Sequence, residues 1–318
     1  MLSEFHNHAP PEESFREAVL EGLGKTPKSV PSKWIYDERG SRLFEAVCEA
    51  PEYYPTRTEM AILGSYAHEI AALTGPDCAL VEFGCGASHK VRLLLDALTS
   101  PAVYVPVDID GETLRRTAET TATDYPEIAV EAVRADLTRP FPLPVAAYSV
   151  SGVRLGIFPG GTIGNFETDQ AHAFFGMCAQ MLKGGGLVVG VDLQKDRAVI
   201  EAAYNDSHDA CPNFNLNLLH RINAELNGNL DTNAFRHSAI YDEARGCMNI
   251  GIESTCHQSA RIAGQDFHFE QQEIIRTQVS YKYTVESFQA LAAQSGFEPL
   301  RAWLDDANLF SLHYFRAP

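Results

Sequence analysis

The chain of 318 residues is 45% apolar and 10% aromatic, a composition that supports one or two substantial hydrophobic cores. Its 25 lysines and arginines stand against 42 aspartates and glutamates, so the formal net charge is −17. This balance argues against a nucleic-acid scaffold and a polybasic membrane binder, because both need a positive surface to neutralise phosphate groups.

The first 75 residues are predicted to form helices separated by ordered loops. The N-terminus lacks the basic segment followed by an apolar segment that marks a signal peptide. Apolar residues recur at helical spacing over residues 13–23 and 57–73, and a glycine follows each segment where a C-terminal cap is expected. Segments 33–40 and 51–57 combine aromatic residues with polar residues or prolines, which favours loops.

From residue 78 onward, short apolar runs alternate with helical patterns. The runs predict strands at 79–83, 103–107, 128–133, 153–158 and 187–191, and the helical patterns lie at 88–98, 111–123 and 168–182. Strand, helix, strand at this spacing is typical of a parallel sheet covered on both faces. The predicted fold class is therefore α/β, with a doubly wound, Rossmann-like sheet.

The alternation stops after residue 192, which indicates a second domain. Residues 196–227 predict one or two helices and 234–281 a β-rich segment, whereas a helix at 285–295 and a strand at 309–315 complete the first sheet. We expect four segments along the chain: an N-terminal segment 1–58 that joins the second domain, a core at 59–195, an inserted α+β domain at 196–283, and a C-terminal completion of the core at 284–318.

The cysteines indicate the compartment. They number seven, an odd count without a Cys-x-x-Cys pair, which fits reduced thiols better than a disulfide framework. Apolar runs are far shorter than the roughly 20 residues of a membrane-spanning helix. The sequence therefore predicts a cytoplasmic protein that does not bind membranes or nucleic acid, and it is compatible with a monomer.

The strongest chemical signal follows the first strand of the core, where Glu82-Phe-Gly84-Cys-Gly86 precedes a helix. The two glycines let a ligand approach the backbone and the N–H groups of the helix N-terminus. A dinucleotide fingerprint would have a third glycine at position 89, where this chain has His89, which weakens the case for NAD.

Two aspartates follow the next two strands. Asp108 can accept hydrogen bonds from both hydroxyls of a ribose, and Asp136 can accept one from an adenine amino group. Singly, the glycines fit an ordinary tight turn and the aspartates fit loop carboxylates or helix N-caps. Together, at the ends of successive strands, they resemble the layout of class I S-adenosylmethionine-dependent methyltransferases. A nucleotide-binding domain with another ligand is the alternative within this fold.

Motifs outside the core make the resemblance more specific. Lys33-Trp-Ile-Tyr-Asp, Pro51-Glu-Tyr-Tyr-Pro-Thr-Arg57, Gly161-Thr-Ile-Gly-Asn165, Phe214-Asn-Leu-Asn217 and Val279-Ser-Tyr-Lys282 resemble the histidine Nα-methyltransferases of ergothioneine biosynthesis. The resemblance runs from about residue 28 to the C-terminus. It implies trimethylation of the α-amino group of L-histidine to hercynine with three molecules of S-adenosylmethionine. It also implies a methyltransferase core and a substrate domain built from the N-terminal segment and an insertion.

The resemblance also implies two sets of site residues. The cofactor set is Tyr36, Gly84, Gly86, Lys90, Asp108, Asp136 and Leu137. The substrate set is Tyr53, Asn165, Tyr204, Met248, Gln278, Val279 and Ser280. Asn165 and Tyr204 are expected to carry catalysis, because an amide oxygen can bind an amine N–H while phenols bind the carboxylate. Structural roles are the alternatives: packing aromatics, a turn residue, a strand hydroxyl and, for Lys90, an ordinary first-turn residue. A cation at a helix N-terminus opposes the helix dipole, however, and so indicates a ligand carboxylate near Lys90.

One position departs from the family, which has a glutamate where this chain has Gln278. That carboxylate would accept the imidazole N–H, and a glutamine can also accept it but carries no charge. Met248 matches the family and would form a soft wall of the pocket. We expect histidine as substrate with altered affinity or pH dependence. The alternatives are another amino acid and a non-catalytic amino-acid sensor.

Metal catalysis and macromolecular substrates are disfavoured. His89, His237, His257 and Cys256 are irregularly spaced and contain no paired ligand motif, so no metal is expected. Methylation of a protein or nucleic acid would need an open groove with a basic rim, and the acidic composition disfavours the nucleic-acid version. A free amino acid is therefore the expected partner.

Overall fold

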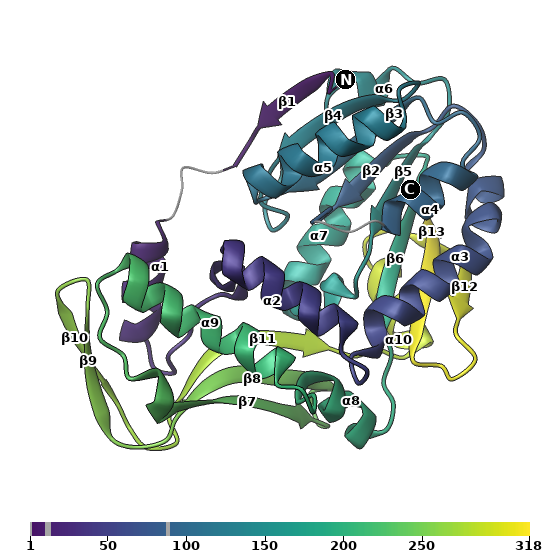
Figure 1. Cartoon of the computed structure of the whole chain (residues 1–318). Helices are drawn as coiled ribbons and strands as arrows, with labels where there is room; N and C mark the ends of the chain where they lie inside the picture. Colours follow the sequence, from purple (N-terminus) through teal and green to yellow (C-terminus); the bar gives the residue numbers. More distant parts are fainter. Residues whose placement is uncertain (1, 10–13, 87–89) are drawn as a thin grey trace. The chain divides into compact units, whose positions relative to one another are not determined.

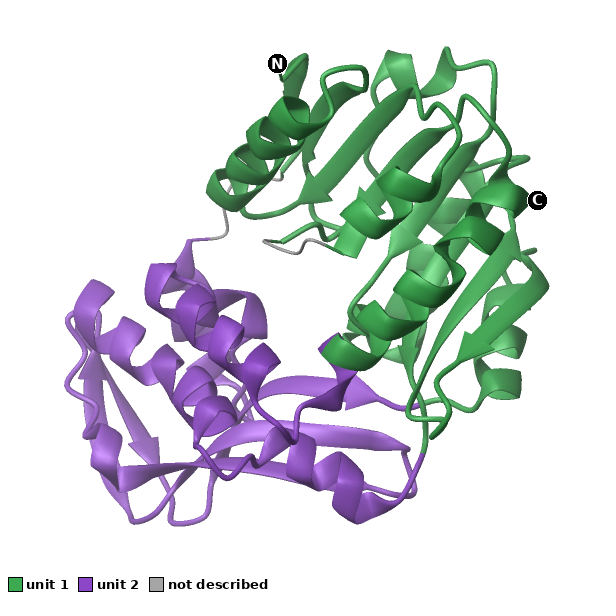
Figure 2. Ribbon diagram, turned by 45° about the vertical axis from the view of Figure 1, so that its right-hand side comes forward, with its two compact units in different colours: residues 1–11, 57–194, 283–318 green, residues 12–56, 195–282 purple. Residues whose placement is uncertain are grey.

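The computed structural model describes residues 2–9, 14–86 and 90–318. The chain forms two compact units, green and purple in Figure 2. Unit 1 consists of residues 1–11, 57–194 and 283–318, and unit 2 of residues 12–56 and 195–282. The boundaries expected at 59, 196 and 284 differ from these by one or two residues.

Among the described residues, unit 1 is built on a sheet of eight strands (Figure 1). In chain order these are β1 (Glu4–Asn7), β2 (Ala79–Phe83), β3 (Val103–Asp108), β4 (Ala129–Arg134), β5 (Arg154–Phe158), β6 (Gly186–Asp192), β12 (Glu298–Leu304) and β13 (Phe310–Arg316). Their spatial order is β1–β4–β3–β2–β5–β6–β13–β12. Neighbours from β1 to β6 are parallel, whereas β13 is antiparallel to β6 and β12. The strand order reverses between β2 and β5, where α/β sheets bind ligands.

Helices cover both faces of this sheet. Residues of α3 (Tyr54–Thr74), α4 (Lys90–Ala97) and α5 (Gly111–Asp124) share one buried apolar cluster with it. Residues of α6 (Val145–Tyr148), α7 (Thr168–Met181) and α10 (Val285–Ala293) share another. Every residue of β2 and β6 is buried, which explains why these strands are continuous apolar runs in the sequence. The predicted α/β doubly wound sheet is confirmed.

The edge strands β1 and β12 have no counterpart among the predicted strands. β1 pairs in parallel with β4, with Glu4 opposite Glu131, so residues 2–9 lie in unit 1 and not, as expected for all of segment 1–58, in the second domain. With four residues and one of them apolar, β1 shows no detectable periodicity. β12 is largely exposed or half-buried at the sheet edge and therefore lacks a buried run.

Unit 2 combines an antiparallel sheet, a hairpin and helices. The sheet has the order β11–β8–β7, with strands β7 (Phe235–Asp242), β8 (Cys247–Ser254) and β11 (Ile274–Tyr281). The hairpin consists of β9 (Gln258–Ile262) and β10 (Gln265–Phe269). The helices are α1 (Phe15–Gly24), α2 (Glu38–Glu49), α8 (Arg197–Tyr204) and α9 (Ala210–Glu225), with short 3-10 turns η1 (Ser32–Ile35) and η3 (Thr232–Ala234). No helix in the described part of the chain is long and apolar enough to cross a membrane.

Both segments predicted as loops near the N-terminus contain helix. Segment 33–40 includes the start of α2, which Asp37 caps by accepting the Gly40 N–H at 2.6 Å. The Asn217 amide also donates to Asp37, at 2.8 Å, so a distant residue stabilises this start. α3 begins at Tyr54 with Pro55 in its first turn, where proline is tolerated.

One face of the unit 2 sheet is buried. In β7, buried Ala239 and Tyr241 flank exposed Ile240, and α8 and α9 contact this strand. A bulge between Arg276 and Gln278 shifts the pairing of β11 with β8. Bulges bend a strand and re-aim its side chains, and this one directly precedes the predicted substrate residues.

Candidate active site

The loop after β2 carries the two glycines of the cofactor motif. Gly84 and Gly86 have φ values of 73° and 49°, in the left-handed region that favours glycine. The N–H groups of Gly84 and Cys85 donate to the Val107 carbonyl, at 2.8 and 3.1 Å, which fixes the loop against the end of β3. His89 lies outside the described residues.

Asp108, at the end of β3, binds this loop directly. Its Oδ2 accepts the Gly86 N–H at 2.9 Å and its Oδ1 accepts the Asp110 N–H at 3.0 Å. The side chain is half-buried, and burial raises the pKa of its carboxyl. The structure thus brings Gly84, Gly86 and Asp108 together on adjacent strand ends of unit 1.

Asp136 and Leu137 follow β4 and lie beside the same loop. The backbone N–H of Ala135 donates to the Asp108 carbonyl at 3.0 Å. Leu137 lies next to Gly84, because a Cβ placed on that glycine would be 3.7 Å from Leu137 Cδ1. Asp136 Oδ1 accepts the N–H and the hydroxyl of Thr138, at 2.9 and 2.6 Å, so this carboxylate also stabilises its own turn.

Lys90, the first residue of α4, is paired inside the protein. Its Nζ lies 2.5 Å from Oε2 of Glu59, a fully buried residue of α3. The Gly160 N–H donates to both oxygens of Glu59, at 2.8 and 2.9 Å. Glu59 therefore links the start of α4 to the loop after β5, across the reversal in strand order. In this structure, the ammonium of Lys90 thus pairs with a glutamate of the chain.

Glu82, at the end of β2, is the acidic residue of the glycine motif and is fully buried. The Tyr104 hydroxyl donates to its Oε2, and its Oε1 has no hydrogen-bond partner among the described residues. Burial raises the pKa of this carboxyl to about 8. At neutral pH Glu82 is therefore largely protonated, and its neutral carboxyl joins β2 to Tyr104 of β3.

Asn165 also belongs to unit 1. It ends the 3-10 turn η2 (Thr162–Asn165), which follows β5 after the left-handed residues Gly160 and Gly161. Its side chain is half-buried. The predicted catalytic asparagine thus shares its loop with Gly160, which binds Glu59.

In unit 2, three predicted substrate residues come together. The Tyr204 hydroxyl, at the end of α8, lies 2.9 Å from Ser280 Oγ on β11. Met248 pairs with Ser280 across the β8–β11 ladder and is fully buried in a cluster against which Tyr204 packs. A hydroxyl pair beside a soft apolar wall matches an amphipathic side chain.

The backbone of Tyr204 is fixed by a buried polar network. The Asn215 amide donates to His237 Nδ1 at 3.0 Å, so His237 Nε2 carries the hydrogen and donates to the Tyr204 carbonyl at 2.9 Å. The Thr277 hydroxyl donates to Asn215 Oδ1 at 2.8 Å, which fixes the amide orientation. Burial lowers the pKa of His237, in agreement with a neutral ring.

Gln278, Val279 and Ser280 are consecutive residues of β11, opposite Ile250, Asn249 and Met248 of β8. Alternation along a strand places Gln278 and Ser280 on one face and Val279 on the other. The face of Gln278 and Ser280 is the one against which Tyr204 packs. The Val279 side chain therefore lies on the face of the sheet opposite to Tyr204.

The two remaining predicted tyrosines, Tyr53 and Tyr36, also belong to unit 2. The Tyr53 ring meets Tyr204 edge-on, with centroids 6.2 Å apart, and burial raises the pKa of its hydroxyl. Tyr36 is 40% exposed and packs edge-on against Phe44 and Phe214. Tyr53 thus contacts Tyr204, and it also packs against the apolar cluster that contains Phe44 and Phe214, the ring partners of Tyr36.

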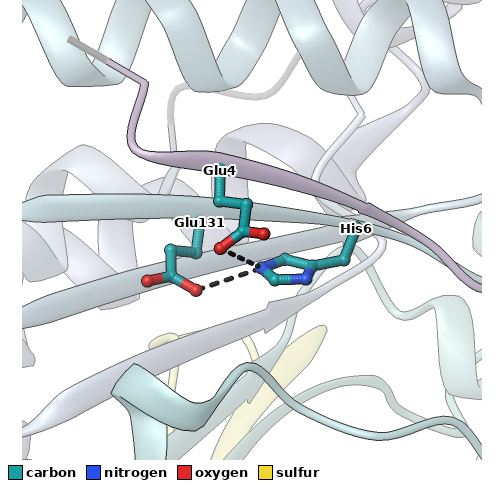
Figure 3. A group of neighbouring side chains, drawn as sticks. All are labelled: Glu4, His6 and Glu131. Carbon is teal, nitrogen blue, oxygen red and sulfur yellow. Dashed lines mark hydrogen bonds and ion pairs between the residues drawn. The ribbon is translucent and has the colours of Figure 1, made fainter.

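Among the described residues, one group has the spacing of metal ligands: Glu4, His6 and Glu131 (Figure 3). His6 Nε2 lies 3.1 Å from Glu131 Oε2 and 3.8 Å from Glu4 Oε2. Glu4 is exposed and the other two are half-buried, where β1 pairs with β4. The contact between His6 and Glu131 joins β1 to β4 and so helps to hold this four-residue strand at the sheet edge.

The structure adds three residues that were not assigned a role from the sequence. Glu59 could have been found from the sequence, because it is a charged residue on the apolar face of α3, at helical spacing from the buried Ile62 and Leu63. Lys282 belongs to a quoted motif, but its contact with Tyr204 depends on residues far away in the chain. His237 was considered only as a metal ligand, because nothing local indicates its bond to a carbonyl.

Comparisons with known proteins identify relatives over nearly the whole chain. A family model described as "Histidine-specific methyltransferase, SAM-dependent" matches residues 15–317. The chain is 36% identical to the histidine N-alpha-methyltransferases of Mycobacterium tuberculosis and Mycolicibacterium smegmatis, over 94% of this chain and 94% of each relative. Among solved structures, a possible exported protein from Bordetella parapertussis matches with a TM-score of 0.50 and 16% identity, over 95% of this chain and 87% of that one. That last likeness concerns the fold alone.

Proposed function

Because the chain belongs to the family of histidine-specific, S-adenosylmethionine-dependent methyltransferases, we propose that it methylates the α-amino group of L-histidine three times to give hercynine. The observation that carries the proposal is the 36% identity to two histidine N-alpha-methyltransferases over 94% of both chains. The contacts within each unit support it with separate groups for the cofactor and for the amino acid.

Unit 1 offers residues that fit S-adenosylmethionine, which supplies a methyl group on a sulfonium. Gly84 and Gly86 leave room at the backbone, and the Asp108 carboxylate lies beside them for the ribose hydroxyls. Asp136 and Leu137 would contact the adenine, and Lys90 the carboxylate of the cofactor. This assignment makes the loop after β2 the centre of the cofactor site.

Unit 2 offers most of the residues proposed for the amino acid. Tyr53, Tyr204 and Met248 would surround it, and Gln278 and Ser280 would bind its side chain. Asn165 of unit 1 would accept an N–H from the α-amino group through its amide oxygen. Tyrosine rings suit this task, because each added methyl makes the amine bulkier and more cationic, and aromatic faces attract cations.

The catalytic contribution of these residues is positioning. The amine must be neutral and in line with the methyl group, so that the new N–C bond forms as the C–S bond breaks. Before each transfer, the protonated amine loses one proton from nitrogen to solvent or to a nearby hydroxyl, and the third transfer leaves a quaternary ammonium without an N–H. The proposal involves no metal.

A second candidate function is Nα-methylation of a different amino acid, and Gln278 favours it. A neutral glutamine cannot stabilise an imidazolium as the family glutamate can. Incubation with S-adenosylmethionine and each of the twenty amino acids, with products identified by mass, decides between the two. Trimethylated histidine is the expected product. If another amino acid is methylated in its place the second function holds, and if none is methylated both functions fail.

Two variants separate cofactor binding from turnover. Asp108→Ala should weaken binding of S-adenosylhomocysteine, whereas Asn165→Ala should bind it normally and lose turnover. Loss of both properties in both variants would indicate misfolding and leave neither residue with its proposed role. Calorimetric binding and product analysis measure the two properties independently.

The proposal extends to the cellular setting. In the described part of the chain the cysteines are not in disulfides, although Cys256 is exposed and Cys48 half-buried, which supports a reducing compartment such as the cytoplasm. We propose a monomeric enzyme that acts on a free small molecule. Size-exclusion chromatography with light scattering tests the oligomeric state directly.

A further inference from the structure

Lys282 follows β11 in unit 2 and is only 2% exposed. Its Nζ donates to the Tyr204 hydroxyl and to Ser280 Oγ, each at 2.8 Å. The ammonium also lies 4.8 Å from the centroid of the Tyr204 ring. Burying a lysine carries a large desolvation cost. Its contacts with two proposed substrate residues therefore suggest a function beyond packing.

These three groups form a closed triangle, because the Tyr204 and Ser280 oxygens are themselves 2.9 Å apart. An ammonium group only donates hydrogen bonds, so both hydroxyl oxygens accept from Lys282. The bond between the hydroxyls uses one of their two hydrogens. In this structure the Tyr204 hydroxyl donates to Ser280 Oγ. The hydrogen of the Ser280 hydroxyl must therefore point away from the triangle.

We propose that Lys282 is a positioning and specificity residue of the amino-acid site, an inference that rests on the proposed function. By occupying lone pairs on both hydroxyls, Lys282 converts the pair into a hydrogen-bond donor with a positive charge behind it. Such a donor selects a side chain that accepts a hydrogen bond and carries no positive charge. For histidine this is the neutral imidazole, bound through its unprotonated nitrogen.

Gln278 complements this arrangement. It lies two residues before Ser280 on the same strand face, and its amide oxygen can accept the N–H of the same ring. A glutamate at this position would favour an imidazolium, whereas the neutral glutamine does not. Gln278 and the buried Lys282 are therefore both expected to favour neutral imidazole over imidazolium.

Other ionisable side chains come from the neighbouring elements: Tyr53 before α3, Glu201 on α8, His237 and Tyr241 on β7, and Cys247 on β8. Burial raises the pKa of Tyr53 and lowers that of His237. The hydrogen bond from Arg197 lowers the pKa of Glu201. These shifts move the pKa values of the three groups away from the pH range near 6.5 in which the imidazole of the substrate titrates.

The test measures the affinity of the S-adenosylhomocysteine complex for L-histidine by calorimetry between pH 5.5 and 8. The wild type should lose about tenfold in affinity for each pH unit below the ring pKa, because only neutral imidazole binds. Lys282→Met should bind about tenfold more weakly at pH 8 and show little pH dependence. At pH 8 it should raise KM more than it lowers kcat. Lys282→Arg keeps the charge and the donors and should retain the pH slope.

The matched control is Lys28→Met. Lys28 is a partly buried lysine of the same unit that pairs with Glu273 at 2.5 Å, and its loss should leave the pH slope unchanged. An unchanged slope in Lys282→Met, or a lost slope in Lys282→Arg, overturns the inference. If Lys282→Met does not fold, the arginine variant alone gives the answer. A wild type that methylates no histidine overturns the proposed function, whereas one that methylates histidine but binds it without pH dependence overturns only the role of Lys282.

Discussion

Glu59→Gln tests whether a buried ion pair supports the proposed cofactor site. Glu59 is fully buried and accepts from Lys90 Nζ at 2.5 Å and from the Gly160 N–H at 2.8 and 2.9 Å. Glutamine keeps the shape but has one acceptor oxygen, and its NH₂ group must face one of these donors. Removing one partner of a buried pair costs about 3–5 kcal/mol. Since Lys90 is 12% exposed and gains some hydration, we expect a loss near the lower limit, about 3 kcal/mol.

Denaturant unfolding and calorimetric binding of S-adenosylhomocysteine measure the effect. The control on the same helix is Glu69→Gln, because Glu69 is 49% exposed, accepts from Trp303 Nε1 at 2.9 Å and lies 3.8 Å from Arg301. It should lose less than about 1 kcal/mol. The double variant Glu59→Gln/Lys90→Met leaves no unpaired cation and should be more stable than Glu59→Gln alone. A loss in Glu59→Gln no larger than in the control, or strict additivity in the double variant, would refute the reasoning.

The remaining predictions concern three other carboxylate or amide positions. Asp108→Asn leaves one acceptor oxygen for the N–H groups of Gly86 and Asp110 and should weaken S-adenosylhomocysteine binding about tenfold in calorimetry; unchanged affinity would remove Asp108 from the cofactor site. Gln278→Glu should raise the affinity for histidine at pH 6 about tenfold and change it less at pH 8, and a loss of affinity at pH 6 would contradict the proposed ring contact. Burial raises the pKa of Glu82 from 4.5 to about 8, so the folded state binds more protons than the unfolded state in this range and stability falls as pH rises from about 4.5 to 8. In the wild type, this effect lowers the free energy of unfolding by at most about 1.4 kcal/mol per pH unit, and Glu82→Gln should lack it. The free energy of unfolding of both proteins is measured in urea at pH 6 and pH 8, and the same decrease in both would disprove the assignment.

The central sheet was predictable because its sequence pattern has one physical cause. β2 and β6 are covered on both faces, so every residue is buried and each strand is a continuous apolar run. The glycines at 84 and 86 were informative for a similar reason, since their positive φ values restrict the choice of residue. β1 carries neither signal, because an edge strand of four residues buries little surface.

The start of α2 could not be predicted for a different reason. The segment around Asp37 is rich in polar and aromatic residues, which favour a loop. The Asn217 amide, which donates to Asp37 and to the Ile35 carbonyl, comes from a helix far along the chain. Long-range hydrogen bonds of this kind decide between two locally acceptable conformations.

In the proposed sites, too, the sequence does not reveal which distant residue a charged side chain contacts. The position of Lys90 at a helix N-terminus indicated a ligand carboxylate nearby, because a cation there opposes the helix dipole. Sequence could not tell a ligand from Glu59, which lies 31 residues earlier. Likewise, Lys282 belongs to a recognisable motif, but its partner Tyr204 is 78 residues away. Local pattern identifies groups that need a partner, and only the fold determines which partner they have.

Glu59 and Lys282 are both buried charged residues whose contacts are better explained by binding than by stability. Each is a buried charge that fixes polar groups of a proposed binding site from behind, in unit 1 and unit 2 respectively. Buried charges are costly, and replacing a whole buried pair by apolar residues is often neutral or stabilising. Stability alone therefore does not explain a buried lysine that donates to two hydroxyls. Preorganised donors and acceptors do explain it, because they need no reorientation when a ligand arrives. On this argument, Lys282→Met combined with Tyr204→Phe should recover stability relative to the single lysine variant while histidine affinity stays low.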